Sequence, residues 1–209
     1  MVAALLLAIA PIARAQGDLP FRPEDLVDVT QVDRHLIAVV GGFAPIQTDL
    51  ELGESVIALR SKGYVGVIAT NRRLLAVASR STGFAELRYR IREKPVGADA
   101  IHVLDRLALV ELHTRLVGFS PELGVWVSTG LGPGEHPRQI QADGNIAAVI
   151  TPRRAIAFSN RSKGFVEEPL SPLEDVERAS ISDVSLTLVL PHKILIYRAG
   201  DVRWSSTIR

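Results

Sequence analysis

The chain has 209 residues, of which 47% are hydrophobic and 22% are charged, and its 24 Lys and Arg nearly balance its 23 Asp and Glu. This composition excludes a disordered chain and a bulk binder of nucleic acid. The sequence contains no Cys, which also excludes disulfide frameworks, thiolate nucleophiles and Cys-ligated zinc. What remains is a globular protein of one β-domain or two small domains, long enough to bury a substantial core.

The first fifteen residues form a predicted secretory signal. Val2 to Ala10 is an uninterrupted apolar run, about half as long as a membrane-spanning helix. It is followed by Ala13-Arg14-Ala15, the small-x-small pattern that signal peptidase accepts, although no Lys or Arg precedes the run. The alternative is a buried N-terminal helix. We expect residues 1–15 to be a signal peptide, 16–23 a linker and 24–209 a secreted or periplasmic domain, free of the membrane after cleavage.

An internal repeat dominates the rest of the sequence. Residues 67–84 match residues 148–165 without a gap, with identities that include an Arg-Arg pair, an Arg-Ser pair and a Gly-Phe pair. The separation corresponds to two periods of about 40 residues, and related units occur between the two segments and after them. In all four units a basic residue is followed by an apolar or aromatic residue and then by an aromatic one: Arg73, Val77 and Phe84; Arg115, Phe119 and Trp126; Arg154, Phe158 and Phe165; Lys193, Tyr197 and Trp204.

Each unit is predicted to be all strand, because β-forming residues alternate with turn signals and no helical stripe is long enough. In one unit we expect strands at 139–142, 146–151, 154–160 and 165–170, with a turn at Asp143-Gly144. The second of these strands is apolar at odd and even positions alike, so both of its faces should be buried. A sandwich would leave one face in water, and we therefore expect each sheet to pack between two others.

Tandem four-stranded units of about 40 residues resemble the blades of β-propellers. The resemblance covers about residues 24–209, but no WD dipeptide, kelch double glycine or calcium loop names a subfamily. It implies an all-β fold, a small propeller of five blades whose first blade is truncated in its outer strand. Four blades preceded by an N-terminal β-segment are the alternative. The first turns of the five units are expected at Asp33, Gly63, Asp105, Gly144 and Asp183.

The recurring aromatic residue of each unit has two possible roles. It could stack on sugar rings, but one aromatic side chain at a fixed place in every blade more often belongs to the core between blades. We therefore expect Phe84, Trp126, Phe165 and Trp204 to be packed between blades.

Catalytic, cofactor and metal chemistry find little support in the sequence. None of the five histidines is spaced to place two imidazoles on one metal ion, and no Gly-x-Ser-x-Gly elbow occurs. Five-bladed propellers include glycosidases, which use paired carboxylates, and Glu111 occupies an otherwise apolar strand position. No partner carboxylate is evident, so a degenerate glycosidase acting on a polysaccharide is the alternative to a non-catalytic binding or scaffold module. The histidines are His35, His102, His113, His136 and His192.

The predicted binding site is a basic rim. In a propeller, the turns between second and third strands lie on the same side of every blade, and in this sequence these turns carry basic residues. A nearly neutral body would then present a ring of positive charge, suited to a carboxylate, sulfate or phosphate, although turns are commonly polar without any binding role. We predict an anionic small molecule, a glycan or a protein as partner, bound by Arg72, Arg73, His113, Arg115, Arg153, Arg154, His192 and Lys193.

Overall fold

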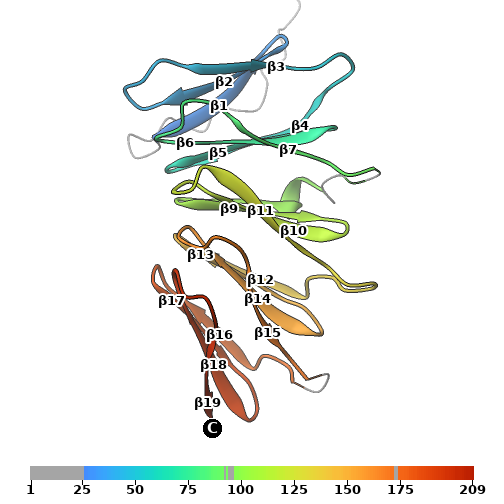
Figure 1. Cartoon of the computed structure of the whole chain (residues 1–209), viewed down its shortest axis with the longest axis vertical. Helices are drawn as coiled ribbons and strands as arrows, with labels where there is room; N and C mark the ends of the chain where they lie inside the picture. The colour runs from blue at the N-terminus through green and yellow to red at the C-terminus, as the bar shows by residue number, and fades with distance from the viewer. Residues whose placement is uncertain (1–25, 92, 94–96, 172–173) are drawn as a thin grey trace, which may run out of the picture.

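The structure is a computed structural model that describes residues 26–91, 93, 97–171 and 174–209 (Figure 1). The signal peptide and linker predicted for residues 1–23 lie outside the described residues. Nearly all regular structure in the described part is β-strand, with one short 3-10 helix, η1 (Ala98–Ala100). No helix in this part is long and apolar enough to cross a membrane.

The strands form five antiparallel sheets in chain order, one of three strands and four of four strands. We refer to these sheets as blades 1 to 5, and to the turns after the first, second and third strand of a blade as its first, second and third turns. Blade 1 contains β1 (Val27–Val32), β2 (His35–Val40) and β3 (Ile46–Asp49); blade 2 contains β4 (Val56–Lys62), β5 (Val65–Thr70), β6 (Arg73–Ala78) and β7 (Ala85–Arg88); blade 3 contains β8 (Ile101–Leu104), β9 (Leu107–Leu112), β10 (Arg115–Ser120) and β11 (Val125–Gly130); blade 4 contains β12 (Gln139–Asp143), β13 (Ile146–Ile150), β14 (Arg154–Ser159) and β15 (Val166–Pro169); blade 5 contains β16 (Arg178–Ile181), β17 (Ser185–Val189), β18 (Lys193–Arg198) and β19 (Ser205–Ile208).

The blades stack face to face in one column, with blade 1 and blade 5 at opposite ends (Figure 1). Four hydrophobic clusters fill the column, and each joins two successive blades. Because alternate side chains of a strand point to opposite faces, the β5 and β6 residues are buried on both sides. The five-bladed all-β fold with a truncated first blade is thus confirmed, and its blades form an open stack.

Blade 1 lacks a different strand from the one expected. In blade 2 the N–H of Tyr89, just after the fourth strand, donates to the second-turn carbonyl of Arg72 at 3.1 Å, and blades 3 to 5 repeat this bond. In blade 1 Leu50 donates in the same way to Arg34 at 2.8 Å. The turn at Asp33 is therefore a second turn, and β1 to β3 correspond to second, third and fourth strands. The expected first turn at Asp33 is therefore wrong, because an Asp with positive φ, here 53°, suits either kind of turn.

The aromatic column between blades is confirmed. Trp204 is 6% exposed, and its ring centroid lies 5.5 Å from that of Tyr197 in the same blade. Its Nε1 donates to the carbonyl of Val166 in blade 4 at 3.1 Å. Trp126 repeats this arrangement, with Nε1 donating to Ala85 in blade 2 at 3.0 Å, although it is only half-buried. Each indole thus ties its blade to the preceding one.

Candidate functional site

The predicted rim residues all lie in or next to the second turns, but the structure separates them into two groups. The first group occupies the turns themselves, and its side chains are exposed. The second group begins the third strands, where Arg73 and Arg115 are only 5% and 6% exposed. The exposed group comprises Arg72, His113, Arg153 and His192, and the inward group comprises Arg73, Arg115, Arg154 and Lys193.

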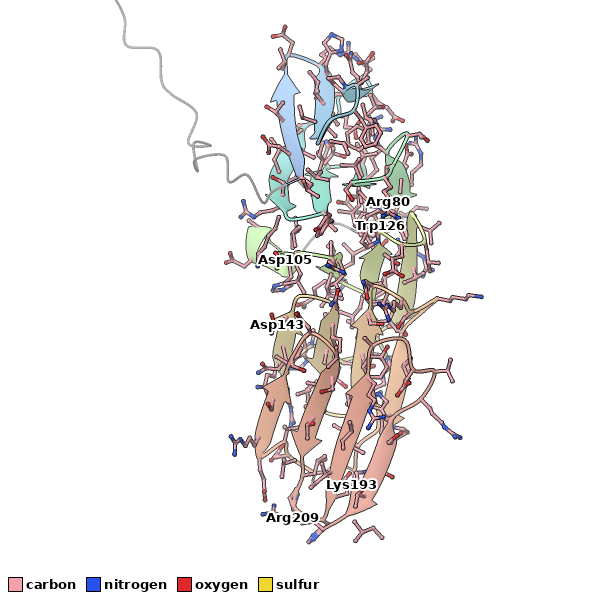
Figure 2. The ribbon with its side chains drawn as sticks, turned by 90° about the vertical axis from the view of Figure 1, so that its left-hand side faces the viewer. Arg80, Asp105, Trp126, Asp143, Lys193 and Arg209 are labelled. Carbon is pink, nitrogen blue, oxygen red and sulfur yellow. The ribbon has the colours of Figure 1, made fainter. Side chains whose placement is uncertain are left out.

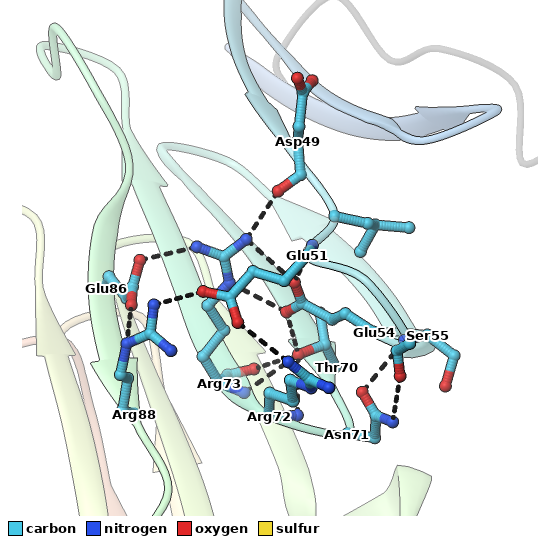
Figure 3. Close-up of polar contacts among 12 residues, drawn as sticks. Asp49, Glu51, Glu54, Ser55, Thr70, Asn71, Arg72, Arg73, Glu86 and Arg88 are labelled. Carbon is cyan, nitrogen blue, oxygen red and sulfur yellow. Dashed lines mark hydrogen bonds and ion pairs between the residues drawn. The ribbon is translucent and has the colours of Figure 1, made fainter.

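Arg73 is held by a dense set of hydrogen bonds in blade 2 (Figure 3). Its Nε and Nη2 donate to the two carboxylate oxygens of Glu54 at 2.9 and 3.0 Å. Its Nη1 donates to Glu86 at 2.7 Å, and Nη2 also reaches the carbonyl of Asp49 at 2.7 Å. Four of the five N–H donors of the guanidinium therefore have partners within the chain.

Glu54 comes from the loop that connects blade 1 to blade 2, and its side chain is fully buried. It accepts a hydrogen bond from the Thr70 hydroxyl at 2.6 Å and one from the backbone N–H of Glu51 at 2.7 Å. The Thr70 hydroxyl oxygen in turn accepts the N–H of Arg73 at 3.0 Å. We refer to this arrangement, a loop glutamate bound to the basic residue that begins the third strand, as the clamp.

The clamp recurs in every later blade. Glu93 binds Arg115 through Nε at 2.9 Å and Nη2 at 2.7 Å, and Glu135 binds Arg154 through Nε at 2.9 Å. In blade 5 a lysine replaces arginine, and its Nζ lies 3.2 Å from a Glu174 oxygen. Each of these glutamates also accepts the backbone N–H of the residue three positions earlier, which closes the connecting loop: Arg90 for Glu93, Gly132 for Glu135 and Ser171 for Glu174.

The clamp holds its carboxylates in the charged state. Burial raises the pKa of Glu135, but hydrogen bonds from Arg154, Thr151 and the Gly132 N–H outweigh burial and bring this pKa down to about 2. The pKa values of Glu54 and Glu93 are lowered in the same way, against the opposing effect of burial. The clamp is therefore a charge-neutral structural unit.

The clamp changes the electrostatics expected for the second-turn rim. Arg73, Arg115 and Arg154 are neutralised there, and exposed Arg72 has its Nη1 3.2 Å from a Glu51 oxygen. A surface cavity of ≈ 630 Å³ on this rim is lined by acidic as well as basic side chains, among them Glu51, Arg72, Arg88, Arg90 and Glu93. Anion binding by the exposed group stays a prediction.

The sequence does contain a signal for the clamp. Glu54 precedes Arg73 by nineteen positions, and Glu135 precedes Arg154 by the same number. In blade 3 the spacing between Glu93 and Arg115 is twenty-two, so the match breaks there. The predicted site contained the basic residues of the clamps but none of the glutamates of the preceding loops.

A larger cavity, of ≈ 960 Å³, lies on the opposite rim, between the third turns of blades 2 and 3. Figure 2 shows this side, with Arg80 and the first-turn residues Asp105 and Asp143 labelled. Its lining includes Tyr64, Arg80, Phe84 and Arg106. The Arg106 guanidinium lies 5.3 Å from the centroid of the Tyr64 ring, a cation–π arrangement.

The two arginines of this cavity differ from those of the clamp. Neither Arg80 nor Arg106 forms an ion pair with any described residue, and both are exposed. The related Arg161, in the third turn of blade 4, lies 3.7 Å from a Glu122 oxygen. The cavity therefore offers two guanidinium groups that form no ion pair with a described residue, although the carboxylate of Glu122, the partner of Arg161, also lines it. Arg80 and Arg161 occupy the same position of the sequence repeat, and the repeat does not predict that Arg161 forms an ion pair while Arg80 does not.

The remaining candidates for chemistry are scattered. His35 shares a 2.7 Å contact with Asp49 on the outer face of blade 1, and burial lowers the pKa of His102, an effect that the charge of Glu111 opposes. Glu111 itself is half-buried in β9. In the part of the chain that the structure describes, no group of three or more His, Asp or Glu is placed to hold a metal ion.

The tandem four-stranded antiparallel sheets are of the kind that form the blades of β-propellers. No protein-family model and no curated protein matches the sequence. Similar solved structures include the N-terminal domain of Nup159 (11% identity, TM-score 0.36, covering 91% of this chain and 62% of that one). Another is Hsv2p of Kluyveromyces lactis (12% identity, TM-score 0.41, covering 95% of this chain and 73% of that one). A third is YCF48 bound to D1 peptide (11% identity, TM-score 0.32, covering 88% of this chain and 69% of that one). The chain spans less than two thirds of the Nup159 domain, and these similarities concern the fold alone.

Proposed function

We propose that this protein is an exported, non-catalytic binding module that holds an acidic segment of a partner protein in the cavity lined by Arg80 and Arg106. The observation that carries the proposal is the contrast between the two rims. On the second-turn rim Arg72 and the buried cations are paired within the chain, and Arg153 is the exposed arginine there without a described ion pair. The cavity on the opposite rim brings together two arginines that have no described ion pair.

The cavity suits an acidic peptide in size and chemistry. Its ≈ 960 Å³ lies at the upper end of ordinary ligand pockets, enough for several residues of an extended chain. Each guanidinium can donate two parallel hydrogen bonds to a carboxylate, and packing of Arg106 on Tyr64 limits the freedom that binding must remove. The ring of Phe84 adds an apolar surface beside them.

The glycosidase alternative requires two carboxylates facing one reaction centre, about 5 to 9.5 Å apart. In the described part of the chain, blades 1 and 5 lie at opposite ends of an open stack, so the blades do not surround a common channel (Figure 1). The half-buried Glu111 lies near His102 and has no carboxylate partner among the described ion pairs or hydrogen bonds. This geometry favours binding over hydrolysis.

An array of acidic peptides, sulfated glycans and carboxylated glycans, probed with residues 16–209, tests the proposal. We expect retention on acidic peptides that weakens as salt is added, because the attraction is electrostatic. The Arg80→Ser/Arg106→Ser variant should lose this retention. Retention on neutral glycans alone, or equal retention of parent and variant on every acidic probe, would contradict it.

Export rests on the sequence of residues 1–15 and has its own test. The mass of the protein recovered from the cell exterior or periplasm should correspond to a chain that begins at Gln16. Full-length protein that starts at Met1 and stays inside the cell would contradict this part of the proposal.

A further inference from the structure

Among the described residues, no sheet packs on the outer face of blade 1 or on the outer face of blade 5. Within the stack, the face of a blade that points toward the preceding blade is apolar in its second and third strands, as in blade 4, where Val149 and Ile156 are fully buried. The corresponding face of blade 1 has no preceding blade among the described residues. It carries Asp28 and Thr30 on β1, and Ile37 and Val39 on β2. Asp28 lies at the edge of this face, where its Oδ1 accepts a hydrogen bond from the Ser61 hydroxyl of blade 2 at 3.0 Å.

Blade 5 ends the stack with the face that points away from blade 4. Leu186 and Leu188 of β17 pack against blade 4, and the alternating positions point away from the stack. These positions are Ser185 and Thr187 on β17, with Ile194, Ile196 and Arg198 on β18. In each end face one strand, β1 or β17, carries polar residues, and the next strand, β2 or β18, contributes the apolar residues.

Internal contacts show which positions would meet if blade 5 of one copy packed on blade 1 of another. A Cβ added to Gly66 in blade 2 would lie 2.5 Å from Val29 and 3.0 Å from Val27 in blade 1, and one added to Gly118 in blade 3 would lie 2.6 Å from Phe158 in blade 4. The same repeat positions at the stack ends place Asp28 over Ser185 and Thr187, and Val39 over Ile196.

The two end faces are complementary in this arrangement. Polar Asp28 and Thr30 would face polar Ser185 and Thr187, while Ile37 and Val39 would face Ile194 and Ile196. Charge agrees as well, because Arg198 pairs with Ser185 in the sheet and so lies beside the position that Asp28 would occupy. Val39, 46% exposed in the isolated chain, would become buried as its counterparts are.

We propose that this protein self-associates head to tail, with the outer face of blade 5 in one copy packed on the outer face of blade 1 in a second copy. The contact is heterologous, because each copy contributes a different surface to it. Repetition of the contact extends the stack, or closes it into a ring if the accumulated rotation permits. This assembly goes beyond the proposed function and does not depend on the cavity of Arg80 and Arg106.

Sedimentation velocity over a concentration series, from about 1 to 500 µM, tests the assembly. For the parent, residues 16–209, we expect the average mass to rise with concentration. Val39→Lys and Ile196→Lys should each remain monomeric throughout, because every contact needs one intact copy of each face. Val125→Lys, at a position of similar exposure on β11, is the control and should associate as the parent does.

A mixture of the two blocking variants gives the decisive result. The Val39→Lys chain keeps its blade 5 face and the Ile196→Lys chain keeps its blade 1 face, so an equimolar mixture should form heterodimers and nothing larger. Likewise, Asp28→Arg and Arg198→Asp should each weaken association at least tenfold. Their mixture should associate again and grow beyond the dimer, because both contacts between unlike chains then pair opposite charges. Circular dichroism confirms that each variant is folded. A monomeric parent at all concentrations, or folded blocking variants that stay monomeric when mixed, would overturn the proposal.

Discussion

The basic residue that begins each third strand is structural, whereas its neighbour in the turn is exposed. Arg73 and Arg72 are adjacent in sequence, yet Arg73 is buried against Glu54 while the Arg72 side chain remains 45% exposed. The cause is strand alternation, since successive residues at a turn and strand boundary point to different environments. One repeated Arg-Arg pair thus contains one clamp residue and one surface residue.

Removal of a clamp glutamate should destabilise the fold strongly. Glu54→Ala removes the buried carboxylate that binds Nε and Nη2 of Arg73 and leaves the partly exposed Glu86 as the remaining ion-pair partner. This loss should lower the free energy of unfolding by about 3 to 5 kcal/mol. Arg72→Ser, the matched control in the adjacent turn, should change it by no more than about half a kcal/mol. Urea denaturation of both variants measures the difference, and similar small losses for the two would contradict the clamp.

The clamp also predicts that the free energy of unfolding decreases at acid pH. The pKa of Glu135 falls from an ordinary 4.5 to about 2 on folding. A lowered folded-state pKa contributes stability that is complete above pH 4.5 and is lost as the pH falls toward 2, because the unfolded carboxylate takes up its proton first. Glu135→Gln should therefore flatten the decline in stability over this window.

Denaturation midpoints measured between pH 6 and pH 2 check this prediction. Glu122→Gln, on the exposed third turn of blade 3, controls for the loss of one carboxylate. If the midpoints of the parent and of Glu135→Gln fall equally between pH 4.5 and pH 2, Glu135 does not contribute to the acid dependence of stability.

At the scale of the blade, the indole side chains connect neighbouring sheets. Trp204→Ala removes a buried ring and its hydrogen bond to Val166, and should cost about 3 to 5 kcal/mol. Trp126→Ala should cost less, because Trp126 is only half-buried. Denaturation of the two variants tests the order, and a Trp126 variant that is less stable than the Trp204 variant would contradict it.

The sequence was sufficient to predict the blades because its repeat is local and periodic. The strand expected at 154–160 is observed at Arg154–Ser159, and the one expected at 139–142 at Gln139–Asp143. The truncated blade was predicted, but its missing strand was misassigned, because a hairpin turn at Asp33 has the same local chemistry wherever it occurs in a blade. Only the bond from Leu50 to Arg34 distinguishes the second turn from the first.

The candidate site was less accessible to sequence reasoning. Whether a surface arginine is paired depends on side chains brought from other segments, as Glu54 is brought to Arg73 across nineteen positions. Arg80 and Arg161 occupy the same repeat position, but only Arg161 has a carboxylate within 4 Å, supplied by Glu122 of the preceding blade. Such pairings are properties of the tertiary structure and leave no pattern in a single unit.

At the scale of the whole molecule, the five blades form an elongated open column. Small-angle scattering of the Val39→Lys variant, chosen to prevent self-association, should give a pair-distance distribution with an extended tail. A symmetric distribution, as expected for a closed disc, would contradict the open stack and remove the basis for free end faces.

The arginines of the two rims differ in their pairing. The clamps neutralise Arg73, Arg115 and Arg154 on the second-turn rim, whereas Arg80 and Arg106 on the opposite rim form no ion pair with a described residue and line one cavity. An anionic partner should therefore distinguish the two rims even though the net charge is small.

Calorimetric titration with a hexaglutamate peptide tests this claim most directly, with residues 16–209 compared with two double variants. Loss of two charge-assisted contacts, worth about 1.5 to 3 kcal/mol each, should weaken binding at least tenfold in Arg80→Ser/Arg106→Ser. Arg72→Ser/Arg153→Ser, which removes the exposed arginines of the other rim, should bind as the parent does. The opposite pattern, with binding lost only in the second variant, would contradict the account.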